Sequence, residues 1–169
     1  MFSKITGRAL ATTALAGAAV LTAGTSAQAC GRTVEGPGHV YDHVFDGTRL
    51  TITVRSGRDG TAIRMRLWNL PESARGRSFG AHVHVKPCTD DPAAAGPHYQ
   101  NPAGTTLEEK EIWLDFTVDA RGRARSKTFR PWTIPAGAAG SVVVHAEATD
   151  PGTGTAGGRA LCTSVPFGT

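Results

Sequence analysis

Residues 50–68 read LTITVRSGRDGTAIRMRLW, and this stretch decides the fold class. Apolar and polar residues alternate from Leu50 to Val54 and again from Ile63 to Leu67. This period-two pattern is typical of half-buried β-strands. Between the two runs, Asp59-Gly60 is a dipeptide that favours tight hairpin turns. The stretch therefore predicts an antiparallel β-hairpin.

The rest of the chain continues the same pattern of short strands separated by turn residues. The composition includes 21 Gly and 10 Pro, and no convincing helix follows residue 29. Further strands are expected at residues 40–45, 79–85, 112–118, 141–148 and 163–167, and in a short run ending near Phe129. About eight antiparallel strands of this kind predict an all-β sandwich or closed barrel. Residues 86–107 and 149–161 are strand-poor and are expected to form two long functional loops.

The N-terminal segment has the organisation of a secretory signal peptide. Lys4 and Arg8 precede an uncharged run at residues 9–21, and Ala27-Gln28-Ala29 matches a signal-peptidase site. We therefore expect a signal peptide at residues 1–29, a single domain at residues 30–169 and an extracytoplasmic location. The alternative is a buried amphipathic helix. The apolar run is too short and too weakly hydrophobic to predict a stable membrane span.

The overall charge gives little support to a nucleic-acid partner. The chain of 169 residues has a formal net charge of +4 and a pI near 9.3, but the predicted signal peptide contains two basic and no acidic residues. Removing it halves the net charge, and no run or stripe of basic residues is evident along the sequence. We therefore expect no nucleic-acid partner. The sequence does not indicate an oligomeric state.

Export would also change the chemistry of the three cysteines. Outside the cytoplasm, Cys88 and Cys162 can persist as a disulfide. Cys30 would be the first residue after cleavage, where it could carry a lipid anchor or remain a free or mixed-disulfide thiol. Ala-Gln-Ala departs from the Leu-x-small-Cys pattern of lipoproteins, which disfavours the anchor.

Four of the six histidines are candidate metal ligands. His82 and His84 are two residues apart in a predicted strand, so their imidazoles leave the same face. His98 lies in a predicted loop, and His145 ends an apolar run. Taken singly, each is also compatible with an ordinary polar-face, loop or half-buried histidine. His39 and His43 are not expected to share a face and are interpreted as bystanders.

Together, four neutral imidazoles on a rigid β-framework would suit Cu(II), which binds nitrogen ligands most strongly among the divalent first-row metals. Arg159 lies three residues before Cys162. If that cysteine were cross-linked, the Arg159 guanidinium would be fixed near the metal and could attract a small anion. The alternative for Arg159 is an ordinary surface arginine.

These motifs, in this order, resemble those of the copper/zinc superoxide dismutase family. The resemblance covers roughly residues 34–165 and rests on FGAHVH at 79–84, GPHY at 96–99, VVHA at 143–146 and GRALC at 158–162. It implies a Greek-key β-barrel with His82, His84, His98 and His145 as copper ligands. It also implies a Cys88–Cys162 disulfide and Arg159 as the residue that docks superoxide. Cys88 lies four residues after His84, which is the spacing in secreted bacterial members.

The zinc site of that family has no counterpart in the sequence. In zinc-containing members, the residue corresponding to His98 bridges copper and zinc and is followed by further zinc ligands, whereas no histidine lies between His98 and His145 here. The chain therefore resembles the copper-only branch. Because a metal-bound imidazole usually donates its second N–H to an acceptor, Glu109 or Glu111 is a candidate partner of His98. The alternative is that both are solvated glutamates.

The resemblance thus implies a secreted copper superoxide dismutase that converts superoxide into O₂ and H₂O₂, with zinc absent. In this interpretation Arg159 and His98 are the catalytic residues, and His98 can supply a proton. The alternative is that solvent supplies both protons, because no zinc bridges His98. The main alternative is a non-catalytic copper-binding or buffering protein on the same β-fold. Arg159 favours the enzyme, because a storage site does not need a guanidinium beside an open coordination position. A metal-free structural barrel is a third possibility, but it would be expected to have lost some of the histidines.

Overall fold

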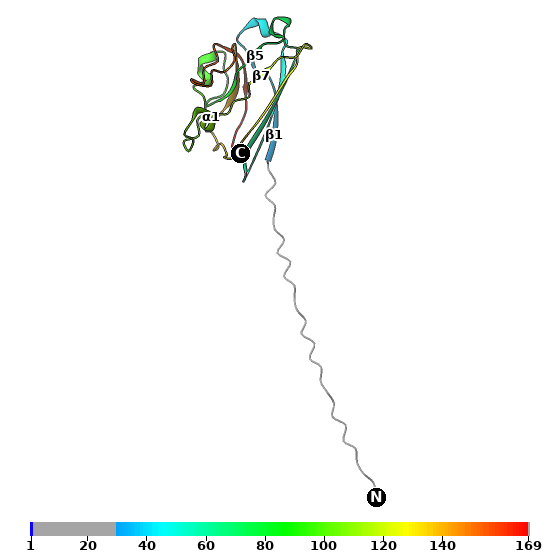
Figure 1. Ribbon diagram of the computed structural model, residues 1–169, viewed down its shortest axis with the longest axis vertical. Helices are drawn as coiled ribbons and strands as arrows, with labels where there is room; N and C mark the ends of the chain where they lie inside the picture. Colours follow the sequence, from blue (N-terminus) through cyan, green and yellow to red (C-terminus); the bar gives the residue numbers. More distant parts are fainter. Residues whose placement is uncertain (2–29, 169) are drawn as a thin grey trace.

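The computed structural model describes residue 1 and residues 30–168, and two four-stranded antiparallel sheets face each other in this part of the chain (Figure 1). Apart from residue 1, the predicted signal peptide falls on residues outside those described. Within the described residues, no helix is both long enough and apolar enough to cross a membrane.

The first sheet contains the hairpin that the sequence predicts. Its strands are β1 (Cys30–Gly36), β3 (Arg49–Gly57), β4 (Gly60–Trp68) and β8 (Ala124–Arg130), in the order β1-β3-β4-β8. β3 and β4 pair so that Leu50 lies opposite Leu67 and Val54 opposite Ile63. The apolar residues of both strands therefore share one face, as the alternation predicts.

The second sheet carries the predicted His-x-His motif. Its strands are β2 (His39–Val40), β10 (Arg159–Ser164), β9 (Ser141–His145) and β6 (Ala81–His84), in the order β2-β10-β9-β6. A small ladder joins β5 (Ser78–Phe79) to β7 (Phe116–Thr117). The helical segments are all short: η1 (His43–Phe45), η2 (Glu72–Ala74), η3 (Pro92–Ala95) and α1 (Leu107–Lys110).

The predicted fold class is confirmed: the described part of the chain is an all-β antiparallel sandwich. Its sheets do not close into one barrel within residues 30–168, and these residues form ten strands. The core lies between the sheets, where Ile52 and Met65 of the first sheet and Val83 and Leu161 of the second are at most 1% exposed.

Near the N-terminus, one predicted strand was wrong and one strand was not predicted. Residues 40–45 form only the end of β2 and then η1, because the Asp42 carboxylate accepts a hydrogen bond from the Val44 N–H and caps that helical turn. β1 was not expected at all. It forms along the edge of β3 through seven consecutive residue pairs, from Cys30 with Ser56 onward, and alternate residues hydrogen-bond to β3.

Two later strands also differ from prediction. Of residues 112–118, only Phe116–Thr117 forms a strand. The Asp115 carboxylate accepts a hydrogen bond from the Ala81 N–H at 3.1 Å, where a backbone carbonyl would accept it in a continuous strand pair. The last strand begins at Arg159, earlier than predicted. It ends at Ser164, before Pro166, which has no N–H to donate.

The implied disulfide is confirmed and joins a loop to the outer face of the second sheet. Cys88 and Cys162 are bonded with their Cα atoms 5.8 Å apart. Val143 and Ala95 pack beside Cys162, and all three are fully buried. The disulfide therefore holds the loop that follows β6 against the strand face opposite to the core.

We expect removal of this disulfide to destabilise the protein substantially. The cross-link closes a separation of 74 residues. In the chain-entropy model a loop of this size contributes about 4 kcal/mol to the free energy of unfolding. Cys88→Ser/Cys162→Ser should lose about that much in urea unfolding, measured against a parent that carries Cys30→Ser to exclude thiol exchange. A loss below about 1 kcal/mol would contradict the expectation.

Candidate metal centre

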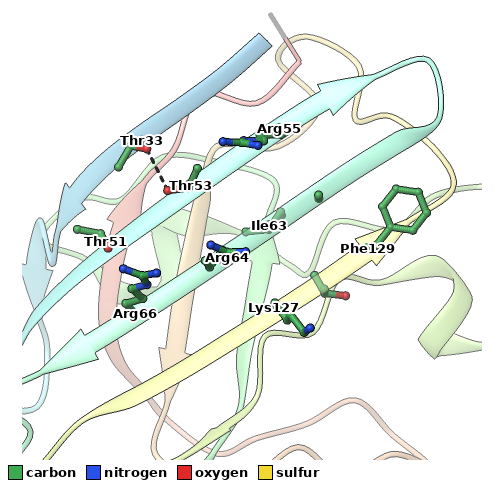
Figure 2. Close-up of a pocket in the computed structure, with 11 residues that line it drawn as sticks. Thr33, Thr51, Thr53, Arg55, Ile63, Arg64, Arg66, Lys127 and Phe129 are labelled. Atoms are coloured by element: carbon green, nitrogen blue, oxygen red, sulfur yellow. Dashed lines mark hydrogen bonds between the residues drawn. The ribbon is translucent and has the colours of Figure 1, made fainter. Parts of the chain in front are cut away.

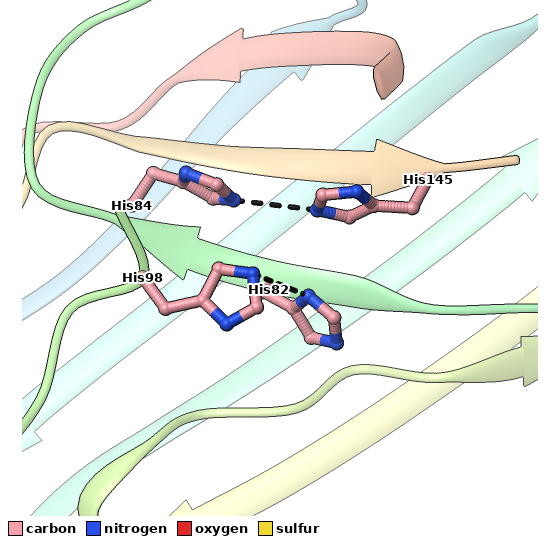
Figure 3. A group of neighbouring side chains, drawn as sticks. All are labelled: His82, His84, His98 and His145. Atoms are coloured by element: carbon pink, nitrogen blue, oxygen red, sulfur yellow. Dashed lines mark hydrogen bonds between the residues drawn. The ribbon is translucent and has the colours of Figure 1, made fainter. Parts of the chain in front are cut away.

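Four histidines meet on the outer face of the second sheet, beneath the two long loops. His82 and His84 lie on β6, and His145 lies at the end of the neighbouring strand β9. His98 comes from the first of these loops, and an isolated β-bridge between His84 and His98 holds that part of the loop beside β6. Figure 3 shows their side chains converging, and one ligand nitrogen from each ring lies within 4.8 Å of the others.

The rings approach one another in two pairs. His82 Nδ1 lies 3.0 Å from His98 Nε2, and His84 Nε2 lies 3.3 Å from His145 Nε2. The other nitrogens of two rings face carbonyl oxygens: His84 Nδ1 is 2.8 Å from the Gly96 carbonyl, and His145 Nδ1 is 3.2 Å from that of Gly157. Because a carbonyl only accepts, both Nδ1 atoms donate and both Nε2 lone pairs point into the cluster.

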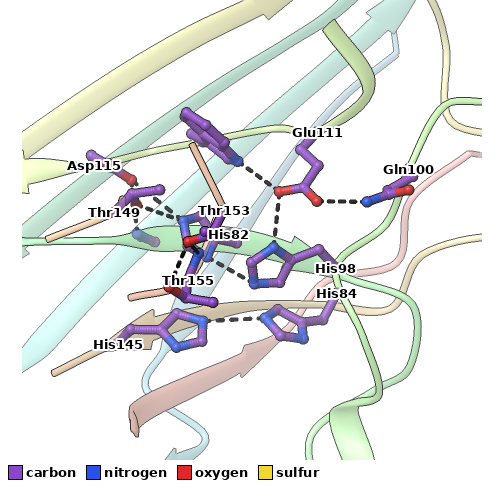
Figure 4. A network of polar contacts seen from close by, with 12 residues as sticks. His82, His84, His98, Gln100, Glu111, Asp115, His145, Thr149, Thr153 and Thr155 are labelled. Atoms are coloured by element: carbon purple, nitrogen blue, oxygen red, sulfur yellow. Dashed lines mark hydrogen bonds and ion pairs between the residues drawn. The ribbon is translucent and has the colours of Figure 1, made fainter. Parts of the chain in front are cut away.

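His82 is held by contacts that the sequence did not reveal. Its Nε2 lies 2.7 Å from Thr149 Oγ1 and 3.7 Å from the Asp115 carboxylate (Figure 4). These contacts keep Nε2 outside the cluster and leave Nδ1 facing it. Thr149 lies in the second long loop, and no local motif marks it. Only the folding of that loop over β6 could identify it.

Glu111 is the carboxylate that contacts His98. His98 Nδ1 donates to Glu111 Oε2 at 2.9 Å, and Trp113 Nε1 donates to the same oxygen at 2.7 Å. Gln100 Nε2 donates to Oε1 at 2.8 Å, so three side chains fix the carboxylate, which is almost fully buried (Figure 4). This leaves His98 Nε2 directed at His82. Of the two candidates for this contact, Glu111 makes it.

Glu109 does not contact His98, so the alternative in which it orients the ring was wrong. Its carboxylate accepts hydrogen bonds from the Thr105 hydroxyl and from the backbone N–H groups of Thr105 and Thr106. Together with Thr106 it forms the capping box of α1, and the hydrogen bonds lower its pKa to about 2. The Thr-x-x-Glu spacing in the sequence could have assigned Glu109 to this helix start.

Burial keeps the cluster in a state suited to metal binding. Desolvation lowers the pKa of His82 to about 2, of His84 to about 3 and of His145 to about 4, and the neighbouring imidazoles add to each shift. These three rings are therefore neutral at pH 7. Neutral imidazoles with lone pairs facing one another are a nitrogen-rich donor set that a transition-metal cation satisfies. The four histidines can thus hold a metal ion.

Arg159 lies at the cavity that leads to this cluster. It pairs with His145 across the β9–β10 ladder, and its guanidinium donates to the Pro92 and Gly96 carbonyls of the first long loop. An open cavity is lined by Arg159, His98 and His145 together with part of the second loop. A fixed positive charge and two candidate ligands therefore face the same space.

The remaining histidines lie apart from the cluster. His39 Nδ1 is 3.3 Å from an Asp90 carboxylate oxygen, and His43 Nδ1 is 3.3 Å from one of Asp46. Neither contributes to the group of ligand atoms found among the described residues. This placement agrees with the interpretation of both as bystanders.

The fold and site define an all-β sandwich protein with a buried four-histidine site that can bind a metal ion. Comparison with known proteins does not assign it more closely: no protein-family model matches the chain, and no curated protein matches it.

We expect Glu111→Gln to weaken metal binding. The amide cannot offer the same charged acceptor to His98 Nδ1, and loss of such outer contacts typically lowers metal affinity about 10- to 100-fold. Competition against a chelator would measure Cu(II) affinity. Glu109→Gln is the matched control and should leave Cu(II) affinity unchanged while weakening the cap of α1. Equal affinities for the two variants would contradict the assigned role of Glu111.

We also expect the metal-free protein to lose stability as the pH falls below about 6.5. In the unfolded chain, His82, His84 and His145 protonate near 6.5, whereas in the folded protein they stay neutral until about pH 4 or lower. Each group therefore costs up to about 1.4 kcal/mol per pH unit across that window. Urea unfolding between pH 7.5 and 5 would measure the slope.

The two histidines outside the cluster, His39 and His43, provide the control for this pH dependence. His39→Gln/His43→Gln should retain the slope, because neither residue belongs to the buried cluster. Stability that does not change between pH 7 and 5 would show that the imidazoles are not held neutral in the fold.

Proposed function

We propose that this chain is an extracytoplasmic copper superoxide dismutase that resembles the copper-only branch of the copper/zinc superoxide dismutase family. The observation that carries the proposal is the position of Arg159, which lines the same open cavity as His98 and His145. A buried histidine cluster alone would suit metal storage equally well. A fixed guanidinium at its entrance suits a small anionic substrate.

The donor set fits copper. His82 Nδ1 and the Nε2 atoms of His84, His98 and His145 would hold it, because these are the four nitrogens that the outer contacts leave free to face one another. Copper would supply the electron chemistry by alternating between Cu(II) and Cu(I), so that one superoxide is oxidised to O₂ and the next is reduced to H₂O₂ with two protons.

Arg159 would bind and orient the anion. Its guanidinium is held by two loop carbonyls, and one of these, that of Gly96, also accepts the His84 Nδ1–H. The same backbone atom therefore positions both the arginine and a proposed ligand. A charge fixed in this way lowers the cost of orienting superoxide, since little side-chain freedom remains to be lost.

His98 is the proposed proton donor among the four imidazoles. Its side chain is 18% exposed and lines the cavity, whereas the other three rings are buried. The Glu111 carboxylate accepts the Nδ1–H and keeps the ring oriented with Nε2 on the opposite side. Nε2 has one lone pair, so it would carry a proton only when it is not bound to copper. In that state the proton would be available at the cavity for the reduced product.

The contact between His98 and Glu111 also supports the copper-only interpretation. In the zinc-containing members that the sequence resembles, the residue corresponding to His98 shares its ring between two metals. Here the Nδ1–H is donated to Glu111, whose carboxylate is also bound by Gln100 and Trp113. We propose that this buried carboxylate takes the place of zinc in orienting His98. The Cys88–Cys162 disulfide is compatible with the proposed extracytoplasmic location.

Direct measurement of superoxide decay tests the proposal. The copper-loaded protein should catalyse decay, and Arg159→Ala should lower the second-order rate constant by about tenfold or more, within the range expected for electrostatic guidance. Arg159→Lys should fall between the two. Arg123→Ala removes the same charge from an exposed turn and should leave the rate constant nearly unchanged.

Metal analysis of each sample separates loss of copper from loss of anion docking. The variants should retain the copper stoichiometry of the parent, since Arg159 is not a proposed ligand. Copper bound without catalysed decay would refute the dismutase and favour a copper-buffering protein. Stoichiometric zinc in the purified protein would refute the copper-only interpretation.

A further inference from the structure

The outer face of the first sheet, opposite to the core, carries a concentration of positive charge. On this face Arg64 lies directly opposite Lys127, and Arg66 directly opposite Arg125. These four residues, which we call the basic block, come from two neighbouring strands and are all exposed. Figure 2 shows Arg64, Arg66 and Lys127 on the same face as Arg55 of β3.

This arrangement of charges does not by itself stabilise the folded chain. Like charges directly opposite one another on adjacent strands destabilise a sheet. Among the described residues, none of the four cations has a carboxylate oxygen within 4.0 Å. The outward-facing acid Glu35 lies on β1, with Thr51 of β3 between it and Arg66. An external anion would relieve the repulsion within the basic block.

A hollow on this face extends across all four strands of the sheet, which suits an extended ligand. It follows the sheet surface and is lined by threonines and cations of β1, β3 and β4, with residues 127–129 of β8 at its far side. Within it, Thr33 Oγ1 and Thr53 Oγ1 lie 3.0 Å apart and can bond to hydroxyl groups of a ligand (Figure 2). A flat bilayer surface would not follow a hollow in a twisted sheet.

The side chains in the hollow also distinguish among polyanions. Phe129 is the single aromatic residue lining it, and this residue is 54% exposed. Binding of single-stranded nucleic acid usually uses several aromatic side chains as stacking platforms, and membrane binding uses a broad apolar surface. One aromatic ring beside hydroxyls and guanidinium groups suits sugar rings that carry anionic groups.

We propose that the outer face of the β1-β3-β4-β8 sheet binds a linear anionic polysaccharide, with its carboxylate, sulfate or phosphate groups on the basic block. Three of the four cations are arginines, whose planar guanidinium groups bind such oxyanions through two parallel hydrogen bonds. Successive side chains on one face of a strand are about 7 Å apart, and neighbouring strands are about 5 Å apart. Charges at this spacing match a polymer with one anionic group on each sugar or on every second sugar. The inference does not depend on the proposed dismutase activity.

Binding to two glycan probes tests this proposal. Heparin is the sulfated probe and polygalacturonate the carboxylated one, and calorimetry with the purified protein would measure both. We expect binding to at least one probe, with affinity falling about tenfold or more between about 50 and 200 mM salt. Arg64→Gln/Arg66→Gln should weaken binding to that probe about tenfold. The thermal unfolding temperature should not fall, because both side chains are exposed and the substitutions relieve repulsion with Lys127 and Arg125.

A charge-matched control separates a defined site from general attraction. Lys86→Gln/Lys110→Gln removes the same charge from residues outside the first sheet and should change the affinity less than about threefold. An equal loss in both double variants would overturn the proposal, and so would no binding to either probe at low salt. Tighter binding to oligothymidylate or to phosphatidylglycerol vesicles, lost in Arg64→Gln/Arg66→Gln, would also overturn it in favour of those ligands.

Discussion

The pairing register between β6 and β9 is the constraint on which the histidine site depends. In this register His82 lies opposite Val143, and His145 follows two residues later on the same outer face. Because side chains alternate along a strand, a slip of one residue would turn His82 and His84 into the core and Val83 out of it. Val83 is 1% exposed between the sheets. The apolar packing that stabilises the sandwich therefore also selects the face that carries the imidazoles.

The loops that bury this face are held by the residues that form the site. The Gly96 carbonyl accepts hydrogen bonds from both His84 and Arg159, two residues before His98 in the same loop. The Cys88–Cys162 disulfide fixes the start of that loop on β10, three residues from Arg159. Loop position, ligand orientation and the placement of the guanidinium are thus coupled. A substitution at Arg159 would therefore act on the loop as well as on the proposed anion site, which is why metal content must be measured beside rate.

Local patterns in the sequence predicted the features that depend on near neighbours in the chain. They predicted the β3–β4 hairpin and the shared face of His82 and His84. β1 was missed because its pairing depends on the free edge of β3 more than on its own composition. Thr149 was missed because it lies 67 residues from His82 and meets it only after the loop folds. The choice between Glu109 and Glu111 required the structure, although the Thr-x-x-Glu spacing could have assigned Glu109 to a helix start.

The distribution of positive charge also depends on contacts between residues that are distant in the sequence. Arg64 and Arg66 are separated by Met65, and Arg125 and Lys127 by Ser126, so no basic run is evident in the sequence. Strand pairing converts two alternating patterns into one block. This block lies on the outer face of one sheet, whereas the histidines lie on the outer face of the other. A polymer bound to the first sheet would therefore leave the cavity beside Arg159 uncovered, so the proposed polymer binding and the proposed dismutase activity would be compatible and would be abolished by separate substitutions.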